Sequence, residues 1–519
     1  MNIARFKLRA MAEARWRGDV SPHFESMMWR LENAIETLPD HPIDGGKPWP
    51  PTSLTTPTVP RFRYSPLRPG DNLTEAGAGS IAQAVAAGVV SMTEVVAAFL
   101  ERSARLDPIL HVWAALDAER ARATARRHDE GFAAGAATGG LLDGVPIGVK
   151  DIFNTAAYPT AANSRVPPAF VEREDAIAVS RLARQGALVL GKTATTEYAY
   201  ADPSEARNPW NTAHTPGGSS SGSAAGVAAR LFPAALGTQT AGSVIRPAAF
   251  CGVVGFKPTI ERIARTDVVP LAVSLDHVGT LTRSVADAAL LYRMMANAVE
   301  DPPWPEATFE TLRPRFAFWP DLLQDHTDEA TWLALREAAT KLERAGAEIT
   351  LVTGDLDFNH SQGFWKDVLA THTIIMAAEV AAHHLQSHPD AIHDLGPRLR
   401  AMVEAGALVP PQLLIQAQER RWAYWQHWHE ISEARTYDAV IVPSAPSTAP
   451  EGLDFTGDPS LNAPWTLLGV PAITIPIALA ENGLPLGMQI VAPYGADARL
   501  LTVADWCEKV IDFREKPQL

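Results

Sequence analysis

Residues 217–223 read GGSSSGS, residues 237–243 read GTQTAGS and residues 144–151 read GVPIGVKD. These three segments combine one lysine with several serines in a backbone of glycine and small residues. A serine hydroxyl attacks a carbonyl only when a base removes its proton, and lysine is such a base only in its neutral form. Burial lowers a lysine pKa because a low dielectric disfavours the ammonium, and the apolar residues before Lys150 predict burial. The segments therefore indicate a serine hydrolase that needs no histidine.

Taken together and in this order, the segments resemble the amidase signature family of amide hydrolases. Ser219 and Ser243 lie 24 positions apart, the spacing between the family's bridging serine and its nucleophile, and Lys150 lies where the family has its catalytic lysine. Four further segments agree with the family pattern: NPWN at 208–211, GFKPT at 255–259, GVPA at 469–472 and GLPLGMQ at 483–489. The resemblance covers about residues 74–515.

The resemblance implies a role for each of the three side chains. Ser243 would attack the substrate carbonyl and carry the acyl group, Lys150 would take the proton, and Ser219 would pass the proton between them. The leaving amine would receive the proton by the same route, and water would then repeat the cycle. The expected reaction is hydrolysis of a carbon–nitrogen amide bond through an acyl-serine intermediate, and esters and carbamates are open to the same route.

The resemblance also assigns roles to the main chain around the nucleophile. The amides of Thr240, Ala241 and Gly242 are expected to form an oxyanion hole, which stabilises the charge that develops on the carbonyl oxygen. Gly218 and Gln239 are expected to bind substrate. Gln239 stands where the family usually has aspartate, and Ala241 replaces the first of two glycines. The polar support of this loop is therefore expected to differ from that of the family.

Two other interpretations of the serine-rich segment are weaker. A run rich in glycine and serine is by itself more often a flexible linker, but Lys150 and Ser243 at matching positions argue against a linker here. Residues 218–222 also fit the Gly-x-Ser-x-Gly nucleophile elbow of α/β-hydrolases, which would make Ser220 the nucleophile. That interpretation requires an acid and a histidine downstream, and none of the fifteen histidines lies in a matching context.

Residues 186–193, GALVLGKT, satisfy the phosphate-loop expression G-x-x-x-x-G-K-[ST]. A phosphate loop follows a strand, whereas the apolar run within this segment itself predicts a buried strand. Nucleotide binding is therefore disfavoured, and Lys192 is expected to be structural or to lie at the edge of the pocket.

Histidines form two local groups, which are His383, His384 and His388, and then His427 and His429. The sequence contains no H-E-x-x-H motif and no cysteine pair at ligand spacing. No metal and no cofactor are expected. The segment WAYWQHW at 422–428 is dense in aromatic residues at helical spacing, and core packing and substrate contact both stay open for it.

Composition narrows the class of protein. The chain has 519 residues and a net charge of −14, which argues against a basic nucleic-acid surface. Cys251 and Cys507 are the only cysteines, so no disulfide framework is implied. The first 30 residues lack the apolar core of a signal peptide, and the longest apolar stretch, 467–480, is too short to span a bilayer. We expect a cytoplasmic enzyme with a small-molecule amide substrate, no nucleic-acid partner and no membrane contact; a homo-oligomer stays open.

Short apolar runs alternate with helix-like segments along most of the chain, which predicts an α/β fold. Strands are expected at 145–149, 188–190, 439–442 and 473–477, and the helix that begins with the Ser91-x-x-Glu94 capping box is expected to stop at Asp107-Pro108. The resemblance implies a single α/β/α layered domain around a large mixed twisted sheet.

The expected organisation has two parts. Residues 1–72 are interpreted as a helical arm followed by a strap with nine prolines between positions 39 and 69. Residues 73–519 are interpreted as the amidase signature catalytic domain, within which 300–430 is the variable substrate-pocket region.

Three functional classes follow. The favoured class is a stand-alone hydrolase of a small apolar or aryl amide, because aromatic residues are frequent between 300 and 430. The alternative is the glutaminase subunit of a tRNA-dependent amidotransferase, which shares the same triad; the arm, Gln239 and the aromatic-rich region argue against it. A catalytically silent binding protein is disfavoured because all three catalytic positions are filled.

Overall fold

The computed structural model describes residues 11–12, 15–16, 19–37, 62–135, 140–169, 174–296, 311–320, 324–352, 361–435 and 437–519. An 11-stranded sheet runs through these residues in the order β1-β3-β2-β4-β6-β5-β10-β11-β9-β7-β8. The strands are β1 (Trp113–Leu116), β2 (Pro146–Lys150), β3 (Leu188–Thr193), β4 (Ala234–Gln239), β5 (Val254–Lys257), β6 (His277–Thr282), β7 (Arg315–Phe318), β8 (Glu348–Leu351), β9 (Ala439–Pro443), β10 (Ala472–Leu479) and β11 (Pro485–Val491).

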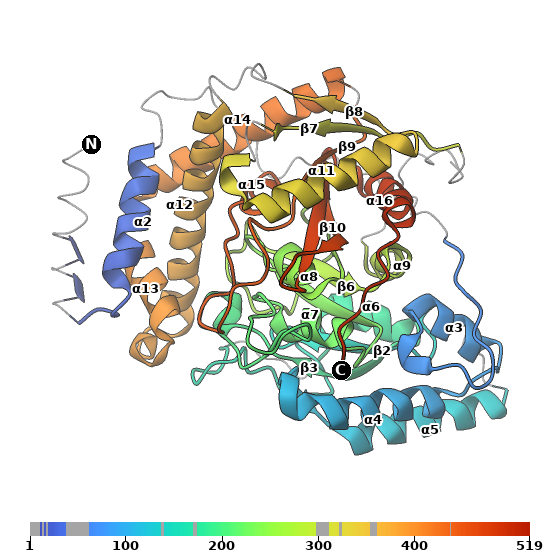
Figure 1. Cartoon of the computed structure of the whole chain (residues 1–519). Helices are drawn as coiled ribbons and strands as arrows, with labels where there is room; N and C mark the ends of the chain where they lie inside the picture. The colour runs from blue at the N-terminus through green and yellow to red at the C-terminus, as the bar shows by residue number, and fades with distance from the viewer. Residues whose placement is uncertain are drawn as a thin grey trace.

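Helices surround the sheet (Figure 1). The described α-helices are α2 (Phe24–Thr37), α3 (Ala78–Ala86), α4 (Met92–Leu110), α5 (Ala118–Ala133), α6 (Ile177–Arg184), α7 (Ser221–Ala228), α8 (Ile245–Cys251), α9 (Val285–Met295), α11 (Glu329–Arg344), α12 (Ser361–Ser387), α13 (Pro397–Gly406), α14 (Pro411–Arg435), α15 (Ala463–Leu467) and α16 (Asp497–Ile511). The predicted α/β fold around one large mixed sheet is confirmed, and the four expected strands correspond to β2, β3, β9 and β10.

The sheet is covered on both faces, as strand β5 shows. Successive side chains of a strand point to opposite faces. A Cβ at Gly255 would lie 2.5 Å from the Cβ of Ala248 in α8, whereas the next residue, Phe256, packs edge-to-face on Tyr292 in α9. Helices α8 and α9 therefore lie on opposite faces of the sheet, which makes three layers. Apolar residues are buried on both faces because neither face meets water.

Helix α4 is longer than the sequence predicts. Its capping box forms as expected, with the Ser91 hydroxyl and the Glu94 carboxylate each accepting from the other's backbone amide. The helix continues through Pro108 to Leu110 instead of stopping at Asp107. The Asp107 carboxylate accepts from the amides of Val112 and Trp113, and its carbonyl accepts from the amide of His111. These bonds satisfy the groups around the helix end in spite of the proline.

The N-terminal helix α2 packs beside α12 and α13 (Figure 1). Its apolar side chains Met28 and Leu31 are buried. Just before the helix, the Ser21 amide donates to the Glu404 carboxylate of α13 at 2.7 Å. Most of the proline-rich strap, residues 38–61, lies outside the described residues. No helix in the described ranges is long and apolar enough to cross a membrane.

The topology brings two separate segments to one edge of the sheet. Strands β2 and β4 are neighbours and run parallel, so their carboxyl ends lie at the same edge. Lys150 ends β2, and Gln239 ends β4 and leads into residues 240–243. Open α/β sheets place their sites outside the carboxyl ends of parallel strands. Lys150 and the segment that leads to Ser243 therefore lie at the same edge of the sheet.

Helix α7, which follows the serine-rich segment, is held by a close backbone approach at Gly222. A Cβ there would lie against the carbonyl oxygen of Val112 and 2.5 Å from the nitrogen of Ala194. We expect Gly222→Ala to lower the free energy of unfolding by about 3 kcal/mol, because backbone atoms cannot move aside. Urea denaturation checks this expectation.

Gly483→Ala is the matched control, since nothing lies within 4 Å of its Cβ position and only its φ of 76° is strained. It should cost about 1 kcal/mol. Equal losses in the two variants would contradict the steric explanation.

Candidate active site

Lys150 is buried at the end of β2. Its Nζ lies 2.7 Å from the Ser219 hydroxyl oxygen and 2.8 Å from the Thr238 hydroxyl oxygen. Burial lowers the pKa of Lys150 well below its ordinary value, and the charge of Asp276 only partly opposes this effect. A neutral amine can accept a proton, so the environment gives Lys150 the property that a general base needs.

Ser219 follows a cis peptide bond between Gly218 and Ser219. The Gly218 carbonyl accepts from the Arg246 guanidinium at 2.7 Å. The guanidinium also donates to the Gly457 carbonyl, so Arg246 of α8 ties the serine-rich segment to residues 456–457. This contact fixes the segment that presents Ser219 to Lys150. Burial lowers the pKa of Arg246 to about 10, so it keeps its charge at neutral pH.

Ser243 lies beside the serine-rich segment, where its carbonyl accepts from the Ser220 amide at 3.4 Å. Ser243 as a whole residue is 8% exposed. Among the described residues, no hydrogen bond joins the Ser243 hydroxyl to Ser219. The structure therefore brings Lys150 and Ser219 into contact and places Ser243 next to them, and the proton transfer between the two serines stays a prediction.

The Gln239 carboxamide is buried and engaged at both ends. Its Oε1 accepts from the amides of Val244 and Ile245 at 2.9 and 3.0 Å. Its Nε2 donates to the Thr466 hydroxyl at 3.0 Å. Gln239 thus caps the beginning of α8 and links residues 240–243 to α15; substrate binding by Gln239 stays a prediction.

Loop 240–243 receives polar contacts from three further directions that the sequence did not indicate. The Thr240 hydroxyl donates to Asp276 at 2.5 Å, the Thr240 carbonyl lies 2.8 Å from His372 Nε2, and the Thr466 hydroxyl donates to the Ala241 carbonyl at 2.7 Å. Burial raises the pKa of Asp276. These partners lie 36 to 225 positions away in the chain, and no local pattern marks them.

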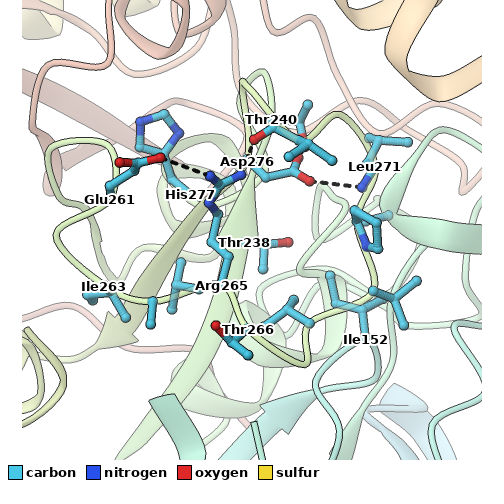
Figure 2. A pocket seen from close by; sticks show the side chains of 17 residues that line it. Ile152, Thr238, Thr240, Glu261, Ile263, Arg265, Thr266, Leu271, Asp276 and His277 are labelled. Atoms are coloured by element: carbon cyan, nitrogen blue, oxygen red, sulfur yellow. Dashed lines mark hydrogen bonds and ion pairs between the residues drawn. The ribbon is translucent and has the colours of Figure 1, made fainter. Parts of the chain in front are cut away.

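A cavity of about 490 Å³ opens beside Thr238, the residue whose hydroxyl contacts Lys150 (Figure 2). Its wall carries the hydroxyl of Thr240, the carboxyl of Asp276 and the Arg265 guanidinium, which pairs with Glu261 at 3.4 Å. None of its described lining residues is Phe, Tyr or Trp. The cavity is therefore lined by aliphatic and polar groups.

The residues of the competing phosphate-loop and nucleophile-elbow motifs make structural contacts. Lys192 lies within β3, where it pairs with Asp151 at 2.8 Å and donates to the Thr160 hydroxyl at 2.8 Å. It is a buried structural residue, so the phosphate-loop expression matches a strand. The Ser220 hydroxyl donates to the Thr238 carbonyl at 3.3 Å. No group of three or more His, Cys, Asp or Glu residues within the described ranges could hold a metal ion.

The fold agrees with comparisons to known proteins. The Amidase family model matches residues 94–501. The chain is 34% identical over 466 residues to a glutamyl-tRNA(Gln) amidotransferase subunit of Prochlorococcus marinus (strain MIT 9303), which covers 80% of this chain and 93% of that subunit. It is 35% identical over 489 residues to the corresponding subunit of Anaeromyxobacter sp. (strain K), covering 84% and 95%. The chain belongs to the amidase signature family.

Solved structures of this family resemble this chain. A crystal structure of an amidase matches with a TM-score of 0.75 and 30% identity, covering 83% of this chain and 99% of the other. The peptide amidase from Stenotrophomonas maltophilia matches with a TM-score of 0.71 and 29% identity, covering 86% and 98%. The resemblance inferred from the sequence is therefore confirmed.

The favoured functional prediction is wrong. Relatives 32–35% identical to this chain each belong to a glutamyl-tRNA(Gln) amidotransferase as one of its subunits, which contradicts a stand-alone hydrolase of a small apolar or aryl amide. The same relatives contradict the expected partners, a small-molecule amide without nucleic acid. The structure supplies a physical reason, because the tryptophans of 422–428, which are among the aromatic residues on which the prediction depended, are buried in the core. Trp422 stacks on Trp425, and Trp428 packs on Trp465.

The lowered pKa of Lys150 predicts a cost in stability. Between its folded and ordinary pKa values, Lys150 is neutral when folded and protonated when unfolded, so protons favour the unfolded chain. We expect Lys150→Met to raise the free energy of unfolding at pH 7 by about 1 kcal/mol or more. The advantage of the variant should shrink as the pH rises toward 10, where the unfolded chain also loses the proton. Urea denaturation across this pH range measures the difference.

Lys192→Met is the matched control because Lys192 is equally buried but paired with Asp151. It should lower stability by about 3 kcal/mol, since it leaves a buried carboxylate without its cation. A Lys150→Met variant that is less stable than the wild type at pH 7 would contradict the neutral amine.

Proposed function

We propose that this chain is the glutaminase subunit of a tRNA-dependent amidotransferase and that it releases ammonia from glutamine through an acyl-serine intermediate. The observation that carries the proposal is the similarity to glutamyl-tRNA(Gln) amidotransferase subunits, which extends over 93–97% of their length. The buried contact between Lys150 and Ser219 supports it, because it supplies a base and a proton carrier beside Ser243.

The proposed reaction uses the three side chains in sequence. Ser243 Oγ attacks the side-chain carboxamide carbon of glutamine while its proton passes to Ser219, and the Ser219 proton passes to Lys150. The proton returns by the same route to the leaving nitrogen, and ammonia departs from a glutamyl ester on Ser243. Water then attacks the ester, with its proton following the same path, and glutamate is released. Glutamine and water thus give glutamate and ammonia.

The oxyanion that forms in both steps needs donors near Ser243. The main-chain amides of residues 240–242 and of Ser243 itself are the proposed donors, as an oxyanion hole of backbone N–H groups requires no side chain. In the proposed assembly the other subunits consume the ammonia. The relatives are named as subunits of a glutamyl-tRNA(Gln) amidotransferase.

The lining of the cavity next to Thr238, which contacts Lys150, suits this substrate better than an aryl amide. The cavity next to Thr238 has hydroxyl, carboxyl and guanidinium groups in its wall and no described Phe, Tyr or Trp side chain. The tryptophans of α14 that suggested an apolar pocket are core residues. A carboxamide with its polar flanks is compatible with such a lining.

Alanine variants test the proposed roles. We expect Ser243→Ala and Lys150→Ala to lower kcat for glutamine at least about 10⁴-fold, because they remove the nucleophile and its base. Ser219→Ala should be severely impaired and Ser220→Ala mildly, since the described contacts of the Ser220 hydroxyl are with the backbone carbonyl and amide of Thr238. Glutamate release measures the rates. Intact mass after treatment with a fluorophosphonate measures the modification of Ser243, and an adduct that persists in Ser243→Ala would contradict the assignment.

The second test concerns the assembly. Co-expression with the other amidotransferase subunits encoded in the same genome should give a complex whose glutaminase kcat/KM exceeds that of the isolated chain at least about tenfold. The same complex carrying Ser243→Ala is the control for contaminating glutaminases. Turnover of a hydrophobic anilide by the isolated chain at a higher kcat/KM than that of glutamine by the complex would refute the proposal.

A further inference from the structure

The loop that precedes Ser243 is held by its carbonyl oxygens. The Thr240 carbonyl lies 2.8 Å from Nε2 of His372 in α12. The Ala241 carbonyl accepts from the hydroxyl of Thr466 in α15 at 2.7 Å. The Gly242 carbonyl accepts from the amide of Arg246 at 2.9 Å. Three consecutive peptide units are therefore each fixed from outside the loop.

A fixed carbonyl also fixes an amide. In a trans peptide unit the C=O and the N–H of the next residue point in opposite directions. The contact to His372 therefore turns the Ala241 amide away from α12, and the contact to Thr466 turns the Gly242 amide away from α15. Helices α12 and α15 pack on each other, so the two amides are turned away from the same layer. Consecutive amides facing one side form a concavity that suits an anion.

These two amides are also available. The Ala241 and Gly242 amides donate to no other residue in the described ranges. Residues 459–462 press against the loop from outside, since a Cβ at Gly242 would lie 2.6 Å from Asn462 Oδ1. Residues 459–462 therefore cover one side of the loop, and the Ala241 and Gly242 amides make no hydrogen bond among the described residues.

His372 can serve as a fixed donor. Its ring is buried in α12, and burial lowers its pKa to about 4, so the imidazole is neutral near pH 7. A carbonyl oxygen can only accept, which places the single ring proton on Nε2.

Gln239 sets the direction of the Thr466 hydroxyl. Its Oε1 accepts two backbone amides, so its Nε2 must face Thr466 and donate to it. The Thr466 hydroxyl has one proton, and the bond donated by Gln239 leaves this proton for a carbonyl. The Ala241 carbonyl at 2.7 Å is the nearer acceptor, and the Asn462 carbonyl lies at 3.2 Å. A carboxylate at position 239 would instead accept the Thr466 proton and take it from the loop.

We propose that His372 and the Gln239–Thr466 pair are positioning residues that aim the Ala241 and Gly242 amides at the oxyanion formed on attack by Ser243. The inference rests on the proposed function only in taking residues 240–243 as the oxyanion loop. It gives His372 of α12 and Thr466 of α15 an influence on the transition state, although neither side chain touches the substrate.

Paired variants separate positioning from general structure. Thr466→Val and His372→Leu remove the donors at nearly constant volume, whereas Thr466→Ser and His372→Gln retain them. We expect kcat for glutamine in the complex to fall about 10- to 100-fold in the first pair, with KM changed less than about twofold, because ground-state binding does not need the oxyanion donors. The second pair should stay within about threefold of the wild type.

Gln239→Glu tests the direction of the hydroxyl. It keeps the side-chain length and the acceptor for α8, and it should lower kcat about as much as Thr466→Val. In the Thr466→Val background it should have little further effect, since no hydroxyl is left to redirect. Urea denaturation shows whether each variant folds. If Gln239→Glu does not fold, the comparison of Thr466→Val with Thr466→Ser and of His372→Leu with His372→Gln still tests the inference.

The second-order rate of Ser243 modification by a fluorophosphonate provides a readout independent of glutamine. It should fall in parallel with kcat in Thr466→Val and His372→Leu. Unchanged modification rates, a rise in KM with constant kcat, or a Thr466→Ser variant as slow as Thr466→Val would each overturn the inference. Absence of glutaminase activity in the wild-type complex would instead refute the proposed function, while the modification rates would still decide the positioning roles.

Discussion

A buried lysine that has no carboxylate in contact within the described part of the chain is the constraint on which the site depends. Strands β2 and β3 are parallel neighbours, and Lys150 and Lys192 are both buried. Lys192 has Asp151 at 2.8 Å, whereas the Lys150 amine is surrounded by hydroxyl and carbonyl oxygens. Burial lowers the pKa of both. Lys192 contacts its counter-ion, whereas Asp276 raises the pKa of Lys150 less than burial lowers it. The choice of partner thus separates a structural lysine from a candidate base.

The arrangement of strands gives this lysine its neighbours. Parallel pairing of β2 with β4 places Lys150 and Gln239 at one edge of the sheet, and α7 and α8 begin there with Ser221 and Ile245. The turns before these helices contain Ser219 and Ser243, so three chain segments meet within one site. Helix α8 also contributes Arg246, whose contact with the Gly218 carbonyl holds two of these segments together.

Much of this arrangement could be predicted from the sequence because its signals are local. The apolar run before Lys150 predicts a buried strand, and the spacing of Ser219 and Ser243 carries the family resemblance. The contacts of His372, Asp276 and Thr466 could not be predicted, since each depends on tertiary packing between segments far apart in the chain. The aromatic composition led to the wrong substrate prediction for the same reason. The segment 422–428 is rich in tryptophan, but only the packing of Trp425 on Tyr494 and of Trp428 on Trp465 shows that these are core residues.

Gln239 shows how a departure from a family pattern can be understood by its partners. As a single position it looks like the loss of a carboxylate that could accept hydrogen bonds from the turn before α8. The structure shows that the carboxamide oxygen accepts both of these bonds, while its nitrogen supplies a donor that a carboxylate lacks. The added donor has a matching acceptor in the Thr466 hydroxyl, which in turn donates to the loop. Glutamine at 239 and a hydroxyl at 466 are thus chemically complementary, so a change at either position alters the direction of the same hydrogen bond.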